Sequence, residues 1–173
     1  MSANRGLPKS IHFIGKSKSG KTTVITKVIA ELHRRSFRVA AIKHGHHAAE
    51  FDRRGKDSWL MAKAGAGAVS FVSTNVTYTV IKTREETPLP NLLQNFTDFD
   101  VVVIEGYKAE RVAKIEVVSH RNNGEMIASV NELVAIVTDC SVDTPLPTFG
   151  FEDIPGLCDF IVKTLHLRLA SSE

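Results

Sequence analysis

The sequence of 173 residues contains two cysteines, one tryptophan and no long apolar run. Cys140 and Cys158 are too few for a disulfide framework or a four-cysteine zinc site, so we expect free, partly buried thiols. No apolar stretch approaches the roughly 18 residues that a membrane-spanning helix needs, and the polar N-terminus lacks the apolar core of a signal peptide. We therefore expect a cytoplasmic protein that does not bind membranes.

The charge balance is nearly even. There are 22 lysines and arginines and 19 acidic residues, a net charge of +3, which suits an anionic ligand. A basic stripe typical of nucleic-acid binders is missing, so no nucleic-acid partner is expected. The apolar content of 43% is sufficient for one core. We predict a single domain over residues 1–173, with residues 1–9 flexible.

A phosphate-binding motif stands near the N-terminus. Residues 15–22 read G-x-x-x-x-G-K-T, between an apolar run that ends at Ile14 and a helical stretch. In this context, backbone N–H groups surround a polyphosphate at a helix N-terminus. Lys21 would reach the β- and γ-phosphates, and the Thr22 hydroxyl would bind Mg2+. The candidate phosphate contacts are Gly15, Lys16, Ser17, Lys18, Ser19, Gly20, Lys21, Thr22 and Thr23.

Apolar periodicity predicts an α/β fold. A helix follows the motif, and the next strand makes a right-handed, parallel βαβ unit. Two extended segments joined by a turn predict a β-arm over residues 68–83. Further strands are predicted at 38–43, 100–105, 114–119 and 133–138, and further helices at 56–64, near 88 and at 154–169. We expect a P-loop NTPase-like three-layer sandwich, with a mostly parallel sheet and helices on both faces.

Two carboxylates mark the ends of the most apolar strand. Ligands collect beyond the carboxyl ends of parallel strands, where Glu105 lies, and Asp100 is about 16 Å away at the other end. Glu105 is therefore the candidate for holding Mg2+ or positioning water. Asp100 is better explained as a residue that pairs with a neighbour at the start of the strand.

The second strand leads into a histidine-rich loop. Lys43, His44, His46 and His47 could contact phosphate or an acidic partner, bind a transition metal or simply face solvent, although the spacing fits no standard structural zinc site. We take Lys43, His44 and His46 as nucleotide contacts. Asp52, in the same loop, is a candidate for orienting the attacking water.

Asp139 closes the strand at 133–138. A carboxylate there could accept hydrogen bonds from the N1–H and the exocyclic amine of guanine, which favours GTP over ATP. The alternative is a loop cap.

The motifs together resemble the molybdopterin-guanine dinucleotide biosynthesis protein B (MobB) family. The phosphate loop is shared with many NTPases, whereas the lysine-histidine and Gly-Lys-Asp-Ser segments are more specific. The matching segments are 15–23, 42–47, 55–58, 64–66, 103–108, 135–139 and 149–150. Gly45 departs from the threonine common between the histidines, and Lys16 and Lys18 stand where small or aromatic residues are commoner.

The resemblance implies a dimeric GTP-binding adapter with weak GTPase activity, acting beside a MobA-type molybdopterin guanylyltransferase. Molybdopterin and molybdoenzymes are further candidate partners. Lys16 matches the extra lysine of some ATPase loops, so it either acts across the dimer or is a solvated lysine near phosphate. The competing interpretation is a small-molecule P-loop kinase, for which Arg53, Arg54 and Lys56 form the one lid-like cluster.

A homodimer is also predicted from the β-arm itself. Its two strands carry more apolar surface than they can bury alone, and a second copy would cover it. The residues concerned are Val69, Phe71, Val76, Tyr78, Val80 and Ile81.

Overall fold

The computed structural model describes residues 6–45 and 53–169. It divides into two compact units, Met1–His44 with Leu93–Glu173, and Gly45–Leu92. The single domain over residues 1–173 stays a prediction. Residues 1–5 lie outside the described residues, and Lys9, expected to be flexible, already belongs to the first strand. Among the described residues, no helix is long and apolar enough to cross a membrane.

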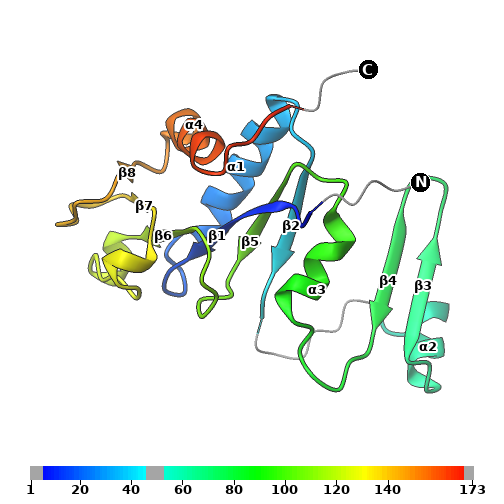
Figure 1. Cartoon of the computed structure of the whole chain (residues 1–173). Helices are drawn as coiled ribbons and strands as arrows, with labels where there is room; N and C mark the ends of the chain where they lie inside the picture. Colours follow the sequence, from blue (N-terminus) through cyan, green and yellow to red (C-terminus); the bar gives the residue numbers. More distant parts are fainter. Residues whose placement is uncertain (1–5, 46–52, 170–173) are drawn as a thin grey trace. The chain divides into compact units, whose positions relative to one another are not determined.

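A six-stranded sheet forms the centre of the first unit (Figure 1). Every neighbouring pair in it is parallel. The strand order is β2 (Val39–Lys43), β5 (Val101–Glu105), β1 (Lys9–Ile14), β6 (Lys114–Val118), β7 (Ala135–Thr138) and β8 (Thr148–Phe149). The parallel α/β sheet predicted from the sequence is confirmed. The short β8 strand was not expected.

Two helices pack against one face of this sheet. α1 (Lys21–Arg34) and α4 (Ile154–Thr164) lie side by side and bury their apolar rows against alternate residues of the strands (Figure 1). Asp153 caps the start of α4, because its side chain accepts a hydrogen bond from the Gly156 N–H. The helix ends at Thr164 and not at residue 169, because His166 has a left-handed φ of 51°.

Polar side chains are buried on the opposite face. His12, Lys114 and Glu116 point there from β1 and β6, together with apolar residues such as Ile14 and Ile136. Irregular segments that include the turns η2 (His120–Asn122) and η3 (Val130–Glu132) follow β6, and Met126 and Ala128 pack against the apolar members of this face. The sequence pattern did not predict this cover.

The second unit contains the predicted β-arm. β3 (Ala68–Val72) and β4 (Thr77–Ile81) form an antiparallel hairpin, closed by a hydrogen bond from the Ser73 N–H to the Val76 carbonyl. α2 (Asp57–Lys63) precedes the hairpin and contacts β3. None of the residues in these three elements is fully buried. α3 (Leu89–Leu93) and η1 (Gln94–Phe96) lead back to β5.

Both cysteines are free thiols, as expected. Cys158 is fully buried between α4 and α1, and Cys140 is partly buried after β7. Burial raises the pKa of the Cys158 thiol to about 12. The thiolate is therefore absent at neutral pH, so this cysteine is chemically inert.

Candidate functional site

The phosphate loop connects β1 directly to α1. Gly15 has a φ of 143° and Gly20 a φ of 91°, both in the region that favours glycine. A Cβ atom on Gly15 would lie 2.4 Å from the Val117 carbonyl oxygen, so no other residue fits without moving the backbone. Gly20 ends the loop as the residue before the first turn of α1. The glycines therefore shape a tight backbone cradle at a helix N-terminus.

Lys21 lies across this cradle. Its ammonium donates hydrogen bonds to the Gly15 carbonyl at 3.1 Å and to the Lys16 carbonyl at 2.6 Å. Partial burial lowers the pKa of Lys21, the charge of Glu105 opposes that shift, and Lys108 and Lys43 add to it. An anion beside Lys21 would relieve this cost, because it would compensate several crowded positive charges.

Two further features of the loop fit a polyphosphate. The Ser19 hydroxyl is buried and has no hydrogen-bond partner among the described residues, so it has a donor available inside the loop. Thr22 and Thr23 occupy the first turn of α1 with exposed side chains. Their hydroxyl groups are accessible to a metal ion or a phosphate at this end of the helix.

Glu105 lies at the carboxyl end of β5, next to the phosphate loop. The Gly106 N–H donates to the Phe13 carbonyl at 3.1 Å, and the His44 N–H donates to the Glu105 carbonyl at 2.9 Å. The Glu105 carboxylate is 20% exposed and lies 3.8 Å from the Lys43 ammonium. The ends of β1, β2 and β5 therefore bring together Glu105 and Lys43 beside the loop, as the strand directions predicted.

His44 is held at this edge by its neighbours. Gly106 has a φ of 106°, and a Cβ atom there would lie 2.9 Å from the His44 Cβ. The His44 ring stacks on Tyr107, with centroids 4.2 Å apart. Gly106 thus permits the close approach of two loops, and the stack on Tyr107 orients the imidazole at this edge.

Lys108 also belongs to the site, although it was not among the contact residues predicted from the sequence. Its charge contributes to the lowered pKa of Lys21, which places it in the same electrostatic environment. The buried Lys114 ammonium donates a 2.6 Å hydrogen bond to the Lys108 carbonyl and so anchors the backbone that carries this side chain. Its presence in the Glu105–Lys108 motif was the available signal.

A segment after β6 also contacts the phosphate loop. Asn122 donates its side-chain amide to the Ser17 carbonyl at 3.3 Å, and Glu125 forms an ion pair with Lys16. Glu116 holds the same segment, because its carboxylate accepts hydrogen bonds from the Ile127 N–H at 2.7 Å and the Ala128 N–H at 3.1 Å. Asn122 and Ser17 are 105 positions apart in the sequence, and Glu125 and Lys16 are 109 apart, so no local pattern could have indicated these two contacts.

Burial also affects the pKa of Glu116. It raises the pKa of this carboxyl, while the two backbone hydrogen bonds and the charges of Lys108 and Lys16 oppose that rise. Glu116 is therefore a buried structural acceptor that organises the segment beside the loop.

Asp100 and Asp139 are both engaged in hydrogen bonds. Asp100 accepts from the Arg38 backbone N–H and from its guanidinium, each at 2.7 Å, as expected for a residue at a strand start. One oxygen of Asp139 accepts from the His120 backbone N–H at 2.8 Å. The other oxygen accepts from the Ser119 hydroxyl at 3.1 Å and lies 2.7 Å from the His120 imidazole.

These bonds bear on base recognition by Asp139. Burial raises its pKa, but the hydrogen bonds from His120 and Ser119 outweigh burial and hold the pKa below the ordinary range. The carboxylate therefore stays ionised and caps the loop after β6. Recognition of guanine by Asp139 stays a prediction.

Several candidate residues lie outside the described part of the chain. They are His46, His47 and Asp52. Within residues 6–45 and 53–169, no group of three or more histidine, cysteine, aspartate or glutamate side chains could hold a metal ion. A carboxylate and a hydroxyl, Glu105 and Thr22, remain the candidate Mg2+ ligands in this part.

The parallel sheet, the glycine-shaped loop and the lysine at the start of α1 define a P-loop nucleotide-binding protein of the α/β class. The comparison with protein families is more specific. The family described as "MobB: Molybdopterin guanine dinucleotide synthesis protein B" matches residues 10–139. The chain belongs to this family.

Curated relatives and solved structures agree with this assignment. The chain is 36% identical to the molybdopterin-guanine dinucleotide biosynthesis adapter protein of Haemophilus influenzae, over 88% of this chain and 86% of that protein. It is 31% identical to the Escherichia coli protein of the same name, over 89% and 91%. A crystal structure of molybdopterin-guanine biosynthesis protein B superposes with a TM-score of 0.70 at 26% identity, covering 90% of this chain and 99% of that one.

Proposed function

We propose that this protein is a GTP-binding adapter in molybdopterin guanine dinucleotide biosynthesis, with weak intrinsic GTPase activity. Binding of a nucleotide is supported by one observation: Lys21, Lys43 and Glu105 lie together at the glycine-shaped loop. The adapter part is supported by the names of the relatives, which cover most of the chain.

In this proposal the triphosphate lies in the backbone cradle. Lys21 exchanges its contacts with loop carbonyls for contacts with the β- and γ-phosphates. Thr22 and Glu105 would hold Mg2+, which neutralises charge on the phosphate oxygens when bound. Lys43 and Lys108 increase the attraction for the anion. Asp52 is proposed to orient water, and Asp139 to read the guanine base.

Binding of GTP is tested by calorimetry with Mg2+ on wild type and Lys21→Ala. We expect the variant to lose nearly all affinity, because the phosphates lose the lysine that faces them. Lys27→Ala, which removes a lysine of the same helix that pairs with Glu152, is the control and should bind normally. An unchanged GTP affinity in Lys21→Ala would show that the phosphate loop is not the GTP-binding site.

Phosphate release distinguishes the adapter from a kinase. With GTP and Mg2+ alone, the adapter should release phosphate slowly and without any acceptor. A kinase would need a small-molecule acceptor for comparable turnover. If phosphate transfer from GTP depends on an acceptor, the protein is a small-molecule kinase and the adapter proposal is wrong.

The partner is proposed to be a MobA-type molybdopterin guanylyltransferase, with molybdopterin and molybdoenzymes as further candidates. Purified guanylyltransferase should be retained by the immobilised protein more strongly with GTP than with GDP. Lys21→Ala should abolish this difference. A cytoplasmic location stays a prediction.

The protein is further proposed to be a homodimer through the β-arm. Val72, Val76 and Ile81 are 69%, 54% and 66% exposed, which is a large apolar surface for a two-stranded hairpin. A second copy would bury it by isologous contact.

A further inference from the structure

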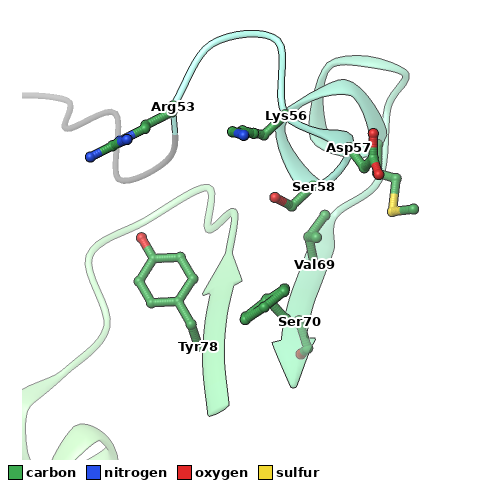
Figure 2. Close-up of a pocket in the computed structure, with 9 residues that line it drawn as sticks. Arg53, Lys56, Asp57, Ser58, Val69, Ser70 and Tyr78 are labelled. Atoms are coloured by element: carbon green, nitrogen blue, oxygen red, sulfur yellow. The ribbon is translucent and has the colours of Figure 1, made fainter. Parts of the chain in front are cut away.

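The Gly45–Leu92 unit contains a pocket of about 620 Å³ between α2 and the hairpin (Figure 2). Ligand pockets commonly measure about 300–1,000 Å³ and combine an apolar wall with a few polar groups. All of the lining residues come from this unit, and none belongs to the phosphate loop. Phosphate-loop chemistry therefore leaves the pocket unexplained.

Two aromatic side chains form the apolar wall. Phe71 of β3 and Tyr78 of β4 are direct partners in the antiparallel register, so they lie side by side on one face of the hairpin. Phe71 is 57% exposed and Tyr78 is 37% exposed. A flat ring placed on this pair would remove apolar surface from water and gain aromatic contacts.

Positively charged and hydroxyl groups form the other side of the pocket. Arg53 and Lys56 come from the segment before α2, and Ser58 comes from its first turn. In Figure 2 these side chains lie across from Tyr78, and the Ser58 hydroxyl faces the space between them. Asp57 is the single acidic lining residue, so the lining carries two positive charges and one negative charge. The pocket thus favours an anion.

We propose that this pocket binds a planar heteroaromatic ring that carries a phosphomonoester. The ring would lie against Phe71 and Tyr78, and Arg53 and Lys56 would bind the phosphate, since charge-assisted bonds to phosphate are strong. The identity of the ligand rests on the proposed function. A molybdopterin guanine dinucleotide joins two such groups, a pterin and a guanine nucleotide. The Gly55–Ser58 motif then acquires a role in binding.

The test uses neopterin monophosphate, a fluorescent pterin phosphomonoester, and follows its anisotropy with the full-length protein. We expect saturable binding, at least about tenfold tighter than for neopterin without the phosphate, because a charge-assisted contact is lost. Lys56→Gln should weaken binding about tenfold for the same reason. Lys63→Gln makes the same change on α2 at a lysine that lies over Trp59 outside the pocket, and should bind like wild type.

Competition with GMP separates the two sources of the ligand. Displacement of the probe assigns the pocket to the guanine nucleotide, and failure to displace it assigns the pocket to the pterin. Lys21→Ala should bind the probe normally. The proposal is overturned by absent saturation, by equal binding of neopterin, by an unchanged Lys56→Gln variant, or by loss of binding in Lys21→Ala.

Sedimentation of the same variants tests whether the pocket is instead a contact between subunits. If Lys56→Gln changes the oligomeric state, the pocket is a subunit contact and the ligand proposal fails. The adapter proposal is tested separately, by GTP binding and by retention of the guanylyltransferase, and neither measurement uses the pterin probe. Probe binding with no GTP binding would leave the pocket assigned and refute the nucleotide part of the proposed function.

Discussion

His12 should make the protein less stable as the pH falls. Its imidazole is fully buried in the central strand β1, next to Lys114 of β6 in the parallel register. Neither ring nitrogen has a hydrogen-bond partner within the described residues. Burial lowers the pKa of His12 from 6.5 to about 4, the nearby backbone of Gly106 opposes the shift, and the charge of Lys114 adds to it.

The sign and size of the effect follow from this shift. The folded protein holds His12 neutral, so its contribution to stability is complete above pH 6.5 and decreases as the pH falls toward 4. At pH 5 most unfolded chains carry a proton on this imidazole, whereas few folded molecules do. The free energy of unfolding should therefore be lower at pH 5 than at pH 7.5 by about 2 kcal/mol on account of this residue.

Urea unfolding at pH 7.5, 6 and 5 measures this contribution when wild type is compared with His12→Leu. Other groups cancel in the comparison, including Glu116, whose raised pKa acts in the opposite direction. The leucine variant should lose about 2 kcal/mol less than wild type over this range. His33→Leu, on the exposed face of α1, should retain the wild-type pH dependence. Parallel curves for wild type and His12→Leu would refute the reasoning, as would a titration of His12 near pH 6.5.

Three further predictions concern the site and the arm. Glu105→Gln should reduce GTP hydrolysis more than GTP affinity, while Asp100→Asn should lower stability and leave turnover intact; the reverse order in folded proteins would contradict the strand-end assignment. Asp139→Asn should reduce the preference for GTP over ATP by about 1–3 kcal/mol in competition binding, and equal preference would remove it from base recognition. Ile81→Lys should shift sedimentation toward the monomer, and a monomeric wild type at tens of micromolar would exclude the arm as an interface.

The sequence predicted those parts of the site that depend on local patterns. The apolar run before Gly15 and the run that ends at Glu105 set two strand directions, and parallel strands bring their carboxyl ends to one edge. The position of Glu105 beside the loop followed from this rule, as did the pairing of Asp100 with Arg38 at the other end. Both outcomes required only the identity and the direction of a strand.

The rest of the site depends on contacts that no local pattern records. The alternation Lys-Ile-Glu-Val at 114–117 is typical of a strand with one face in solvent, yet Lys114 and Glu116 are buried. They are buried because the irregular segment after β6 folds back over that face, and its hydrogen bonds to Glu116 form only in the folded chain. A short apolar strand such as β8 is equally hard to distinguish from a loop.

The buried charges beneath the sheet edge connect stability with the site. Lys114 is almost fully buried, and its ammonium holds the Lys108 carbonyl at the edge where Lys21 and Glu105 lie. Burial is the main reason that His12 stays neutral, and the charge of Lys114 adds to it, so the residue that anchors Lys108 also contributes to the expected loss of stability in acid. A Lys114→Met variant separates these effects: it should bring the pKa of His12 closer to its ordinary value and weaken GTP binding through Lys108. A GTP affinity equal to that of wild type, with His12 shifted as expected, would show that Lys108 needs no such anchor.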